Sequence, residues 1–448
     1  MVLGLGETGL SLLRYLKAQH ARARVADSRY NPPGLEEAKT ILSQPLIYCG
    51  PFYDDLFAGA DLVAISPGVS LRDPVVARAV TCGIPVVGDI ELFAQALPQL
   101  NRPKVIAITG SNGKTTVTSL VEHLCKAAGK VSIAAGNISP AVLDVLMKRG
   151  HRQPDVWVLE LSSFQLETTS SLNPDAATVL NVTEDHLDRY DNIDEYAAAK
   201  ARIFNGAAIQ VLNRNDERSM AMAHKDCEVI TFGLDEAPNA NDFGILHIDG
   251  ATWLAQGKEP LIAASALRIA GLHNITNALA ALALCRAIDL PMQALLLGLR
   301  SFEGLPHRVE LVADIDGVSY YDDSKGTNVG ATEAALKGLG KPAVVILGGE
   351  GKGQDFTPLN AAVAQHARGV VLIGRDAGLI EAALQGCGVT MIHAGHMQEA
   401  VHKAAQLARP GDAVLLSPAC ASFDMFRNYA HRAEVFITAV LELERGAT

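Results

Sequence analysis

A loop of small polar residues around one lysine is the most specific chemical signal in the sequence. Residues 109–116 read Thr-Gly-Ser-Asn-Gly-Lys-Thr-Thr and follow an apolar run at 105–108. In a phosphate-binding loop, backbone N–H groups surround the phosphates, the lysine neutralises the β and γ phosphates, and the next hydroxyl reaches Mg²⁺. Ile108 replaces the first glycine of the usual G-x-x-x-x-G-K-[ST] pattern, so the loop is shorter. The sequence therefore predicts an ATP site formed by Gly110, Ser111, Asn112, Gly113, Lys114, Thr115 and Thr116.

A second group of polar residues follows apolar runs further along the chain. Glu160 ends one such run, and Asp185 and His186 come shortly after another. The carboxyl ends of parallel strands meet at one edge of a sheet, where ligands bind. Carboxylate and imidazole groups there can hold a metal ion that bridges ATP and a substrate. Lys200 lies in an expected helix at 193–204, and on spacing alone it is a surface lysine.

A glycine-rich turn near the start, Gly-Leu-Gly-Glu-Thr-Gly at 4–9, has the G-x-G-x-x-G spacing. Such glycines let a pyrophosphate approach the N-terminus of a helix, which favours anions. Asp27 follows an expected strand at 23–26, where an acid can bond a ribose or another hydroxyl-rich group. The first apolar run contains only Val2 and Leu3, whereas a strand usually needs about five residues. Either the first strand is short or the gene start is misassigned.

Two later segments suit a nucleotide. Asn274 and Asn277 lie three residues apart at the head of an expected helix and share one of its faces. Their amides can bond a nucleotide, or they can cap the helix. Arg308 and Lys325 suit phosphate, and Asp323 suits a ribose hydroxyl.

The segment Ser-Pro-Ala-Cys-Ala-Ser-Phe-Asp-Met-Phe at 417–426 follows a further expected strand. A serine at a helix entrance offers a hydroxyl and backbone donors to a carboxylate. Cys420 has no His/Asn partner pattern that would make it a nucleophile, so it is expected to be a small packed residue.

The elements that must position these residues follow the pattern of α/β units. Short runs rich in Val and Ile alternate with helix-like segments, as buried parallel strands do. Expected strands include 62–65, 105–109, 156–159, 177–181, 344–347, 370–373 and 413–417, and expected helices include 10–17, 115–128 and 274–287. Polar, proline-containing links near 97–103 and 302–307 divide the chain into three expected α/β domains, 1–97, 98–304 and 305–448.

The composition limits the classes of function. The chain has 448 residues, of which 49% are hydrophobic and 19% charged, and this argues against long disorder. A net charge of −11 argues against a general nucleic-acid or anionic-membrane role. Seven cysteines without a C-x-x-C pair indicate reduced cytosolic thiols. No signal peptide or membrane span is predicted, so a cytoplasmic protein is expected.

Taken in order, these motifs resemble the Mur ligase family of ATP-dependent amide ligases over essentially the whole chain. The segments that carry the resemblance are 109–116, 160–166, 181–188, 196–200, 273–277, 306–308 and 323–328. Residues 161–165, 322–328 and 417–426 resemble the D-glutamate-adding branch in particular. The chain also has no Asp-Asn-Pro-Arg segment, which marks the diaminopimelate- or lysine-adding branch.

The resemblance implies a fold and a set of roles. The implied fold is a Rossmann-like N-terminal domain, a central P-loop ATPase domain with a parallel sheet, and a Rossmann-like C-terminal domain. The implied catalytic residues are Lys114, His186 and Lys200, and the implied Mg²⁺ ligands are Thr115, Glu160, His186 and Lys200. Lys200 matches the family's carbamylated lysine, in which a carbamate turns a cation into an anionic metal ligand.

The resemblance also implies three sets of binding residues. Further ATP contacts are Asn274, Asn277, Arg308, Asp323 and Lys325. The UDP-sugar contacts are Gly6, Thr8, Asp27, Ser28, Arg29, Ser66 and Asn137. The D-glutamate contacts are Lys352, Ser422 and Phe423. The chain departs from the family pattern at Ser139, where glycine is usual, and at Gly326, where alanine is usual.

The implied reaction adds D-glutamate to UDP-N-acetylmuramoyl-L-alanine during peptidoglycan precursor synthesis. The substrate carboxylate attacks the γ-phosphate of ATP, and the amine of D-glutamate then attacks the acyl phosphate. Catalysis is expected to be mainly positioning and charge neutralisation by Lys114 and Mg²⁺. Closure of the C-terminal domain is expected to bring Lys325 and Ser422 to the site and to exclude water. The protein is expected to be a monomer.

Three alternatives remain open. One is another amide ligase, such as folylpolyglutamate synthase or a different Mur branch. Another is a nicotinamide-dependent dehydrogenase, which the turn at 4–9 suggests but which needs no ATP site. The third is a nucleotide-binding regulatory module without chemistry, for which Glu160 and Lys200 would be dispensable.

Overall fold

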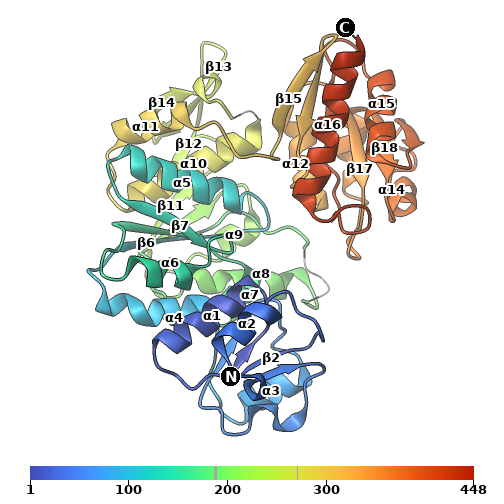
Figure 1. Ribbon diagram of the computed structural model, residues 1–448. Helices are drawn as coiled ribbons and strands as arrows, with labels where there is room; N and C mark the ends of the chain where they lie inside the picture. Colours follow the sequence, from blue (N-terminus) through green and yellow to red (C-terminus); the bar gives the residue numbers. More distant parts are fainter. Residues whose placement is uncertain (186–188, 270, 448) are drawn as a thin grey trace.

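The structure, a computed structural model that describes residues 1–185, 189–269 and 271–447, contains three α/β lobes (Figure 1). Each lobe has its own sheet: five strands in the N-terminal lobe, nine in the central lobe and six in the C-terminal lobe. The expected α/β class is therefore confirmed. The chain passes between the sheets at 88–103 and 264–309. Both expected domain limits fall in these stretches, and the limits themselves stay predictions.

The N-terminal lobe has a fully parallel sheet in the order β3-β2-β1-β4-β5. Its strands are β1 (Val2–Leu3), β2 (Val25–Asp27), β3 (Ile47–Cys49), β4 (Val63–Ile65) and β5 (Val86–Val87). Its helices are α1 (Glu7–Ala18), α2 (Leu35–Ile41), α3 (Pro74–Thr81) and α4 (Asp89–Ala96), with 3₁₀ turns η1 (Gln44–Leu46), η2 (Asp54–Phe57) and η3 (Leu97–Gln99). Strand β1 pairs with β2 and β4 at the centre of the sheet.

The central lobe has the order β14-β13-β12-β11-β10-β9-β6-β8-β7, parallel up to β12 and antiparallel beyond it. Its strands are β6 (Lys104–Thr109), β7 (Ser132–Gly136), β8 (Val156–Glu160), β9 (Ala176–Val179), β10 (Ile209–Asn213), β11 (Glu228–Phe232), β12 (Phe243–Ile248), β13 (Ala251–Gln256) and β14 (Glu259–Ala263). Its helices are α5 (Lys114–Ala127), α6 (Val142–Arg149), α7 (Ser163–Glu167), α8 (Ile193–Ala201), α9 (Glu217–Ala221), α10 (Leu272–Ala287) and α11 (Met292–Ser301), with η4 (Arg202–Phe204) and η5 (Ala264–Ala266).

The C-terminal lobe has the order β15-β16-β20-β17-β18-β19, with an antiparallel edge strand β15 on an otherwise parallel sheet. Its strands are β15 (Glu310–Ile315), β16 (Val318–Asp322), β17 (Ala343–Gly348), β18 (Ala367–Ile373), β19 (Thr390–His393) and β20 (Ala413–Leu416). Its helices are α12 (Val329–Gly338), α13 (Leu359–His366), α14 (Ala377–Ala383), α15 (Met397–Leu407) and α16 (Tyr429–Ala447). Residues 417–428 contain no helix, so the prediction of a helix entrance within the segment 417–426 was wrong.

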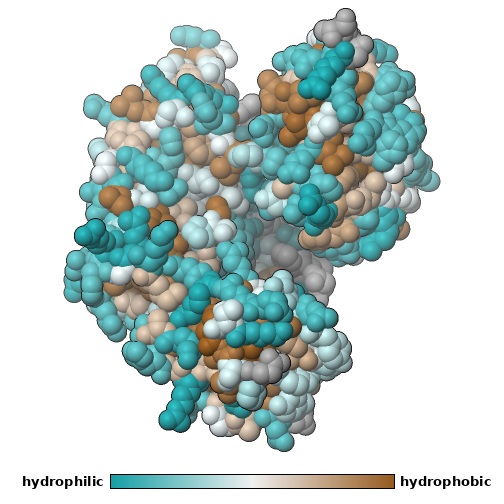
Figure 2. Space-filling model, viewed as in Figure 1, coloured by the Kyte–Doolittle hydropathy of each residue, from teal (hydrophilic) through white to brown (hydrophobic). Residues whose placement is uncertain are grey.

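The lobes are joined in different ways. One continuous apolar cluster runs from the N-terminal lobe into the central lobe, and within it the rings of Phe93 and Trp157 meet edge to face at 5.0 Å. Arg14 adds a two-pronged ion pair to Asp144 across the same boundary. Among the described residues, the two apolar clusters of the C-terminal lobe contain only residues of that lobe. A furrow separates it from the rest of the molecule (Figure 2).

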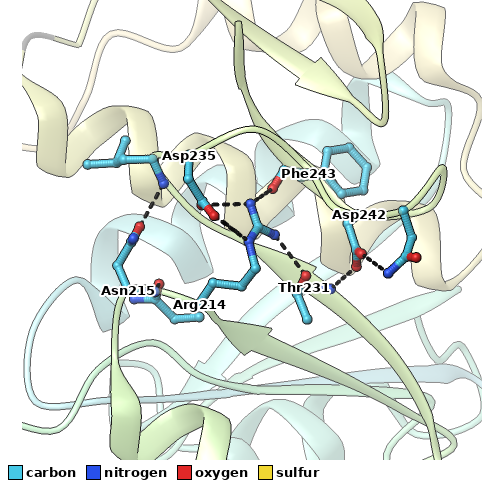
Figure 3. Close-up of polar contacts among 9 residues, drawn as sticks. Arg214, Asn215, Thr231, Asp235, Asp242 and Phe243 are labelled. Carbon is cyan, nitrogen blue, oxygen red and sulfur yellow. Dashed lines mark hydrogen bonds and ion pairs between the residues drawn. The ribbon is translucent and has the colours of Figure 1, made fainter.

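A polar network connects the ends of β10, β11 and β12 in the central sheet (Figure 3). Arg214, just after β10, bonds the carboxylate of Asp235 (2.8 Å), the hydroxyl of Thr231 (2.7 Å) and the backbone carbonyl of Phe243 (2.9 Å). Asp242 accepts from the Thr231 N–H at 2.6 Å. Strands β11 and β12 pair at one position, Phe232 with Phe243. The bonds to Asp235 and Asp242 therefore tie the connection between these two strands to the end of β10 and to β11. In the part of the chain described, no helix has the length and apolar character needed to span a membrane.

Candidate active site

The phosphate loop lies between β6 and α5. Gly110 and Gly113 have φ angles of 156° and 83°, which favour glycine. A Cβ on Gly113 would lie 2.7 Å from Oδ1 of Asn277, so this turn requires glycine because α10 packs against it. Helix α5 begins at Lys114, and its first N–H groups and its dipole suit an anion.

Lys114 is held at the centre of the loop. Its Nζ donates to the carbonyls of Gly110 (2.7 Å) and Ser111 (2.9 Å). Burial lowers the pKa of Lys114, although the carboxylates of Glu160 and Asp185 act to raise it, and Arg308 lowers it further. Backbone carbonyls therefore hold the amine in the loop, where the γ-phosphate of a nucleotide would replace them.

Lys200 is not the surface lysine that spacing alone indicated. It is 1% exposed, and its Nζ donates to the same Gly110 carbonyl at 3.0 Å and lies 4.3 Å from the ring centre of Tyr196. Burial and the nearby charge of Lys114 hold the pKa of Lys200 well below its usual range, while Asp185 opposes that change. The amines of Lys114 and Lys200 therefore share the Gly110 carbonyl.

Glu160 ends β8 beside the loop and is 2% exposed. Its Oε1 accepts from Asn137 Nδ2 at 2.8 Å. Its Oε2 is buried and has no hydrogen-bond partner among the described residues. An unpaired buried carboxylate oxygen is costly without a cation, so this atom suits a Mg²⁺ ligand. Thr115 lines the same cavity, and His186 lies outside the described residues.

The C-terminal lobe adds a second group of charges. Burial lowers the pKa of Arg308, with Asp323 and Glu160 opposing it. Burial raises the pKa of Asp323 to about 7, and Ser417 donates to its Oδ2 at 2.6 Å. Lys325 lies 3.8 Å from the ring centre of Tyr429, and burial, followed by the charge of Arg308, lowers its pKa to about 8.

One cavity of about 810 Å³ brings both groups together. Of the residues proposed from the sequence, it is lined by Ser111, Asn112, Gly113, Lys114, Thr115, Thr116, Asn137, Glu160, Asn274, Asn277, Arg308, Asp323 and Lys325. Asn277 donates to Asn274 Oδ1 at 3.2 Å, so the two amides share a helix face. The N-cap of α10 is Gly271, so neither amide caps the helix.

The raised pKa of Asp323 gives a stability test. The pKa of Asp323 in the folded protein, about 7, exceeds the ordinary value of about 3.9 in the unfolded chain. Protonated Asp323 therefore stabilises the folded protein fully below about pH 4, and this stabilisation is lost as the pH rises toward 7. Asp323→Asn should therefore match the wild type at pH 4 and exceed it at pH 8, by about 4 kcal/mol at most. Calorimetric melting of the ligand-free protein at both pH values measures this. A variant that is less stable than the wild type at pH 8 contradicts it.

The glycine-rich turn of the N-terminal lobe lies at the end of β1. A Cβ on Gly9 would lie 1.9 Å from the Gly4 carbonyl oxygen, which explains the last glycine by close packing. Helix α1 begins at Glu7 after the N-cap Gly6, and nothing lies within 4 Å of a Cβ built on Gly6. The hydroxyl of Ser66 is buried without a partner in the described structure, and it borders the Gly4 turn.

Asp27 has most of its bonding capacity occupied. It accepts from the Leu5 N–H (2.7 Å) and from the Arg29 N–H, Nε and Nη2 (2.9, 2.9 and 2.7 Å). Burial acts to raise the pKa of Asp27, but the bonds from Arg29 and Leu5 hold it below the usual value. Asp27 thereby orients Arg29, whose side chain is 55% exposed, while Ser28 is exposed.

The three residues implied for D-glutamate do not line the cavity. Ser422 is buried, Phe423 is 68% exposed and Lys352 is exposed. The charge of Lys352 nevertheless contributes to the lowered pKa of Lys325, so it lies toward the site. Cys420 is fully buried, and burial raises the pKa of its thiol to about 12, as expected for a packed residue.

Comparison with known proteins gives one consistent result. Residues 1–88 match the Mur ligase MurD-like N-terminal domain, 108–285 the Mur ligase middle domain, and 307–420 the Mur ligase glutamate ligase domain. Proteins of Methylobacillus flagellatus and Nitrosomonas europaea are 58% and 55% identical over 99% of this chain and 97% and 96% of their own. Both are named UDP-N-acetylmuramoylalanine--D-glutamate ligase.

The chain belongs to the Mur ligase family. Two solved structures share its fold. UDP-N-acetylmuramate-alanine ligase MurC of Thermotoga maritima has a TM-score of 0.60 at 19% identity and covers 98% of both chains. MurF of Acinetobacter baumannii has a TM-score of 0.62 at 16% identity and covers 98% of this chain and 93% of its own.

Several residues of this Mur ligase line the cavity without having been proposed as site residues from the sequence: Asn181, Thr183, Asp185, His273, His307, Asn328 and Tyr429. His307 Nδ1 lies 2.6 Å from Asp322 Oδ2, and Asn328 donates to Asn112 Oδ1 at 3.1 Å between two lobes. Asp185 belonged to the group of residues for which a metal ion was suggested, but it was not among the implied Mg²⁺ ligands. Tyr429 had no signal at all, since it comes from the first turn of a helix distant in sequence.

Proposed function

We propose that this chain is a cytoplasmic ATP-dependent ligase that joins the carboxylate of UDP-N-acetylmuramoyl-L-alanine to the amine of D-glutamate in peptidoglycan precursor synthesis. One observation carries the proposal: the cavity between the central and C-terminal lobes combines a phosphate loop, a buried carboxylate oxygen that has no partner among the described residues, and a second set of cations. The two substrates are those named for relatives that are 55% and 58% identical over nearly their whole lengths.

The residues at the cavity suit phosphoryl transfer to a carboxylate. A carboxylate is a poor electrophile, so its oxygen first attacks the γ-phosphate and ADP leaves. Lys114, Arg308 and Lys325 supply positive charge at the cavity, where charge on the transferred phosphoryl group needs neutralisation. The amine of D-glutamate then attacks the acyl carbon, the C–O bond breaks, phosphate leaves and the amide forms.

Glu160 and Thr115 fit a Mg²⁺ site. Oε2 of Glu160 is a buried oxygen without a partner in the described residues, and Asn137 fixes the other carboxylate oxygen. Oxygen donors of this kind are what Mg²⁺ prefers. When bound, the ion would neutralise phosphate charge and orient the nucleotide. His186 remains a proposed ligand.

Lys200 is proposed to carry a carbamate. An uncharged amine attacks CO₂ and releases a proton, and burial beside Lys114 favours the uncharged form. The carbamate would be an anion next to Lys114 and the Gly110 carbonyl. The charge of Lys114 disfavours a second cation at Lys200, but it would attract the anionic carbamate. The carbamate would also offer a further oxygen ligand near Glu160.

The substrates are proposed to enter from the two outer lobes. The turn at Gly6 and Thr8, with Arg29 and Ser66, would bind the UDP-sugar, since helix N-termini and exposed guanidinium groups suit a diphosphate. Asp27 would act by orienting Arg29. Lys352, Ser422 and Phe423 would hold D-glutamate from the C-terminal lobe. The protein is proposed to act as a monomer.

Phosphate release from ATP tests the reaction and its amino acid. The assay contains Mg²⁺ and UDP-N-acetylmuramoyl-L-alanine, with D-glutamate, L-glutamate, meso-diaminopimelate or no amino acid. We expect release only with D-glutamate. Release with a different amino acid would support the ligase activity but assign the chain to another branch of the family. No release in any mixture, with ATP still bound, would contradict the proposal and favour a regulatory module.

A further inference from the structure

The side chain of Asn112 links the phosphate loop to the C-terminal lobe. Its Oδ1 accepts a hydrogen bond from Nδ2 of Asn328 at 3.1 Å, and its Nδ2 donates to the hydroxyl of Thr183 at 3.2 Å. The backbone of Asn112 is held as well, because its N–H donates to Oδ1 of Asn181 at 2.8 Å and its carbonyl accepts from Nδ2 of Asn181 at 3.1 Å. The central lobe therefore fixes Asn112, and Asn112 in turn fixes the position of Asn328.

Asn328 begins helix α12 and is buried. Its Oδ1 caps the helix by accepting from the N–H of Ala331 at 2.8 Å, which leaves its Nδ2 to donate to Asn112. The first turn of α12 approaches the loop closely, since a Cβ on Gly330 would lie 3.1 Å from Nδ2 of Asn112. Further along, α12 packs against α10 of the central lobe (Figure 1). One amide thus both starts α12 and docks it on the phosphate loop.

Gln354 connects the start of α12 to two other segments of the C-terminal lobe. Its Oε1 accepts from the N–H of Val329 at 3.0 Å, and its Nε2 donates to the carbonyl of Ala419 at 2.7 Å. Gln354 follows Lys352 by two residues, and Ala419 precedes Ser422 by three. The glutamine therefore ties the helix start to both segments that carry residues proposed for D-glutamate.

We propose that Asn328 and Gln354 are positioning residues that couple the phosphate loop to the segments 349–354 and 417–426, which carry the residues proposed for D-glutamate. This inference rests on the proposed ligase function. Each step of the path is a hydrogen bond between neighbouring segments, and the two segments are also joined to each other by backbone bonds. Because the nucleotide binds at the loop, an occupied loop holds the amino-acid segments in place before the amine attacks.

Two variants of the full-length protein interrupt the path at different points. Asn328→Ser keeps a good helix cap, but serine is too short to reach Asn112. Gln354→Met keeps the length of the side chain and removes both of its bonds. We expect each variant to raise KM for D-glutamate about 3- to 10-fold. KM for UDP-N-acetylmuramoyl-L-alanine should stay within about 2-fold, since its proposed residues lie in the other two lobes. Steady-state phosphate release measures both constants.

The double variant tests whether the two residues act along one path. Its KM for D-glutamate should exceed that of the weaker single variant by no more than about 2-fold, whereas two independent effects would multiply. Asn192→Ser is the matched control, because Asn192 also caps a helix, α8, through the N–H of Glu195 at 2.9 Å, but within the central lobe. We expect both KM values of this control to match those of the wild type.

Hydrogen–deuterium exchange measures the coupling without any ligase chemistry. A non-hydrolysable ATP analogue with Mg²⁺ should slow amide exchange in residues 349–356 of the wild type about 3-fold or more, although this segment does not line the nucleotide cavity. The slowing should be lost in Asn328→Ser and Gln354→Met and kept in Asn192→Ser. Exchange in the phosphate loop should be slowed in all four proteins.

Three results would overturn the proposal. One is equal slowing of residues 349–356 in the wild type and in both path variants. Another is the absence of this slowing in the wild type while the phosphate loop is slowed. The third is an unchanged KM for D-glutamate in both path variants. If the wild type releases no phosphate, the ligase function fails, while the exchange comparison still decides the coupling.

Discussion

Replacement of Lys114 by methionine is expected to lower kcat by about 10³-fold or more. The amine lies in the phosphate loop on the carbonyls of Gly110 and Ser111, where it would neutralise the γ-phosphate. Methionine keeps the length and the apolar stem but removes the charge. The backbone N–H groups of the loop remain, so nucleotide affinity should fall far less than kcat. Steady-state phosphate release and fluorescent-nucleotide titration measure the two quantities.

Lys104→Met provides the control for Lys114→Met. Lys104 starts the strand that leads into the loop, and its Nζ pairs with Asp175 at 2.6 Å with the lysine side chain 55% exposed. Exposed pairs of this kind contribute about 0–1 kcal/mol, so kcat should stay within about 2-fold. A Lys114→Met enzyme that keeps a tenth of the wild-type kcat would contradict the role given to this amine.

Removal of the proposed carbamate is expected to have the second largest effect. Lys200→Met should lower kcat by about 10²- to 10³-fold. The substitution removes the proposed anionic metal ligand, and it also removes the Lys200 amine that donates to the Gly110 carbonyl. Wild-type enzyme depleted of CO₂ should lose activity and regain it on addition of bicarbonate. Lys200→Met should not respond, and Lys104→Met should respond like the wild type.

Carbon-13 NMR identifies the carbamate directly. With ¹³C-bicarbonate, the wild type should show one carbamate resonance that is absent from Lys200→Met. A wild type that is insensitive to CO₂ and lacks the resonance would leave Lys200 as an amine bonded to Gly110 and would remove it from the metal site.

The sequence predicted the alternation of strands and helices well because each buried strand is short, rich in branched residues and bounded by turn residues. The expected strand at 156–159 is observed as β8, one residue longer. The expected helix at 193–204 ends as α-helix at Ala201 and continues as a 3₁₀ turn. The helix entrance expected within 417–426 is absent, and the backbone of this segment instead bonds distant residues: the N–H of Ala419 donates to the Gly326 carbonyl, and Ala421 exchanges two backbone bonds with Glu350.

The candidate site also contains residues that could be predicted from the sequence and residues that could not. The phosphate loop could be predicted because its residues are contiguous and their spacing reflects the chemistry. The burial of Lys200 could not be predicted from spacing, since it depends on Tyr196 and on the loop carbonyl that Lys114 also uses. Tyr429 was missed because the residue it contacts, Lys325, lies in another segment of the chain. Asp27 bonds Arg29, a local pair that a search for ribose contacts does not anticipate.

The most direct test of the acyl phosphate is the fate of the substrate's carboxylate oxygen. UDP-N-acetylmuramoyl-L-alanine with ¹⁸O at both oxygens of that carboxylate is incubated with ATP, Mg²⁺, D-glutamate and the enzyme. Mass spectrometry then measures the ¹⁸O content of each product. The account predicts one ¹⁸O in the released phosphate and one in the new amide carbonyl. Unlabelled phosphate, or label in AMP, would contradict activation by attack on the γ-phosphate.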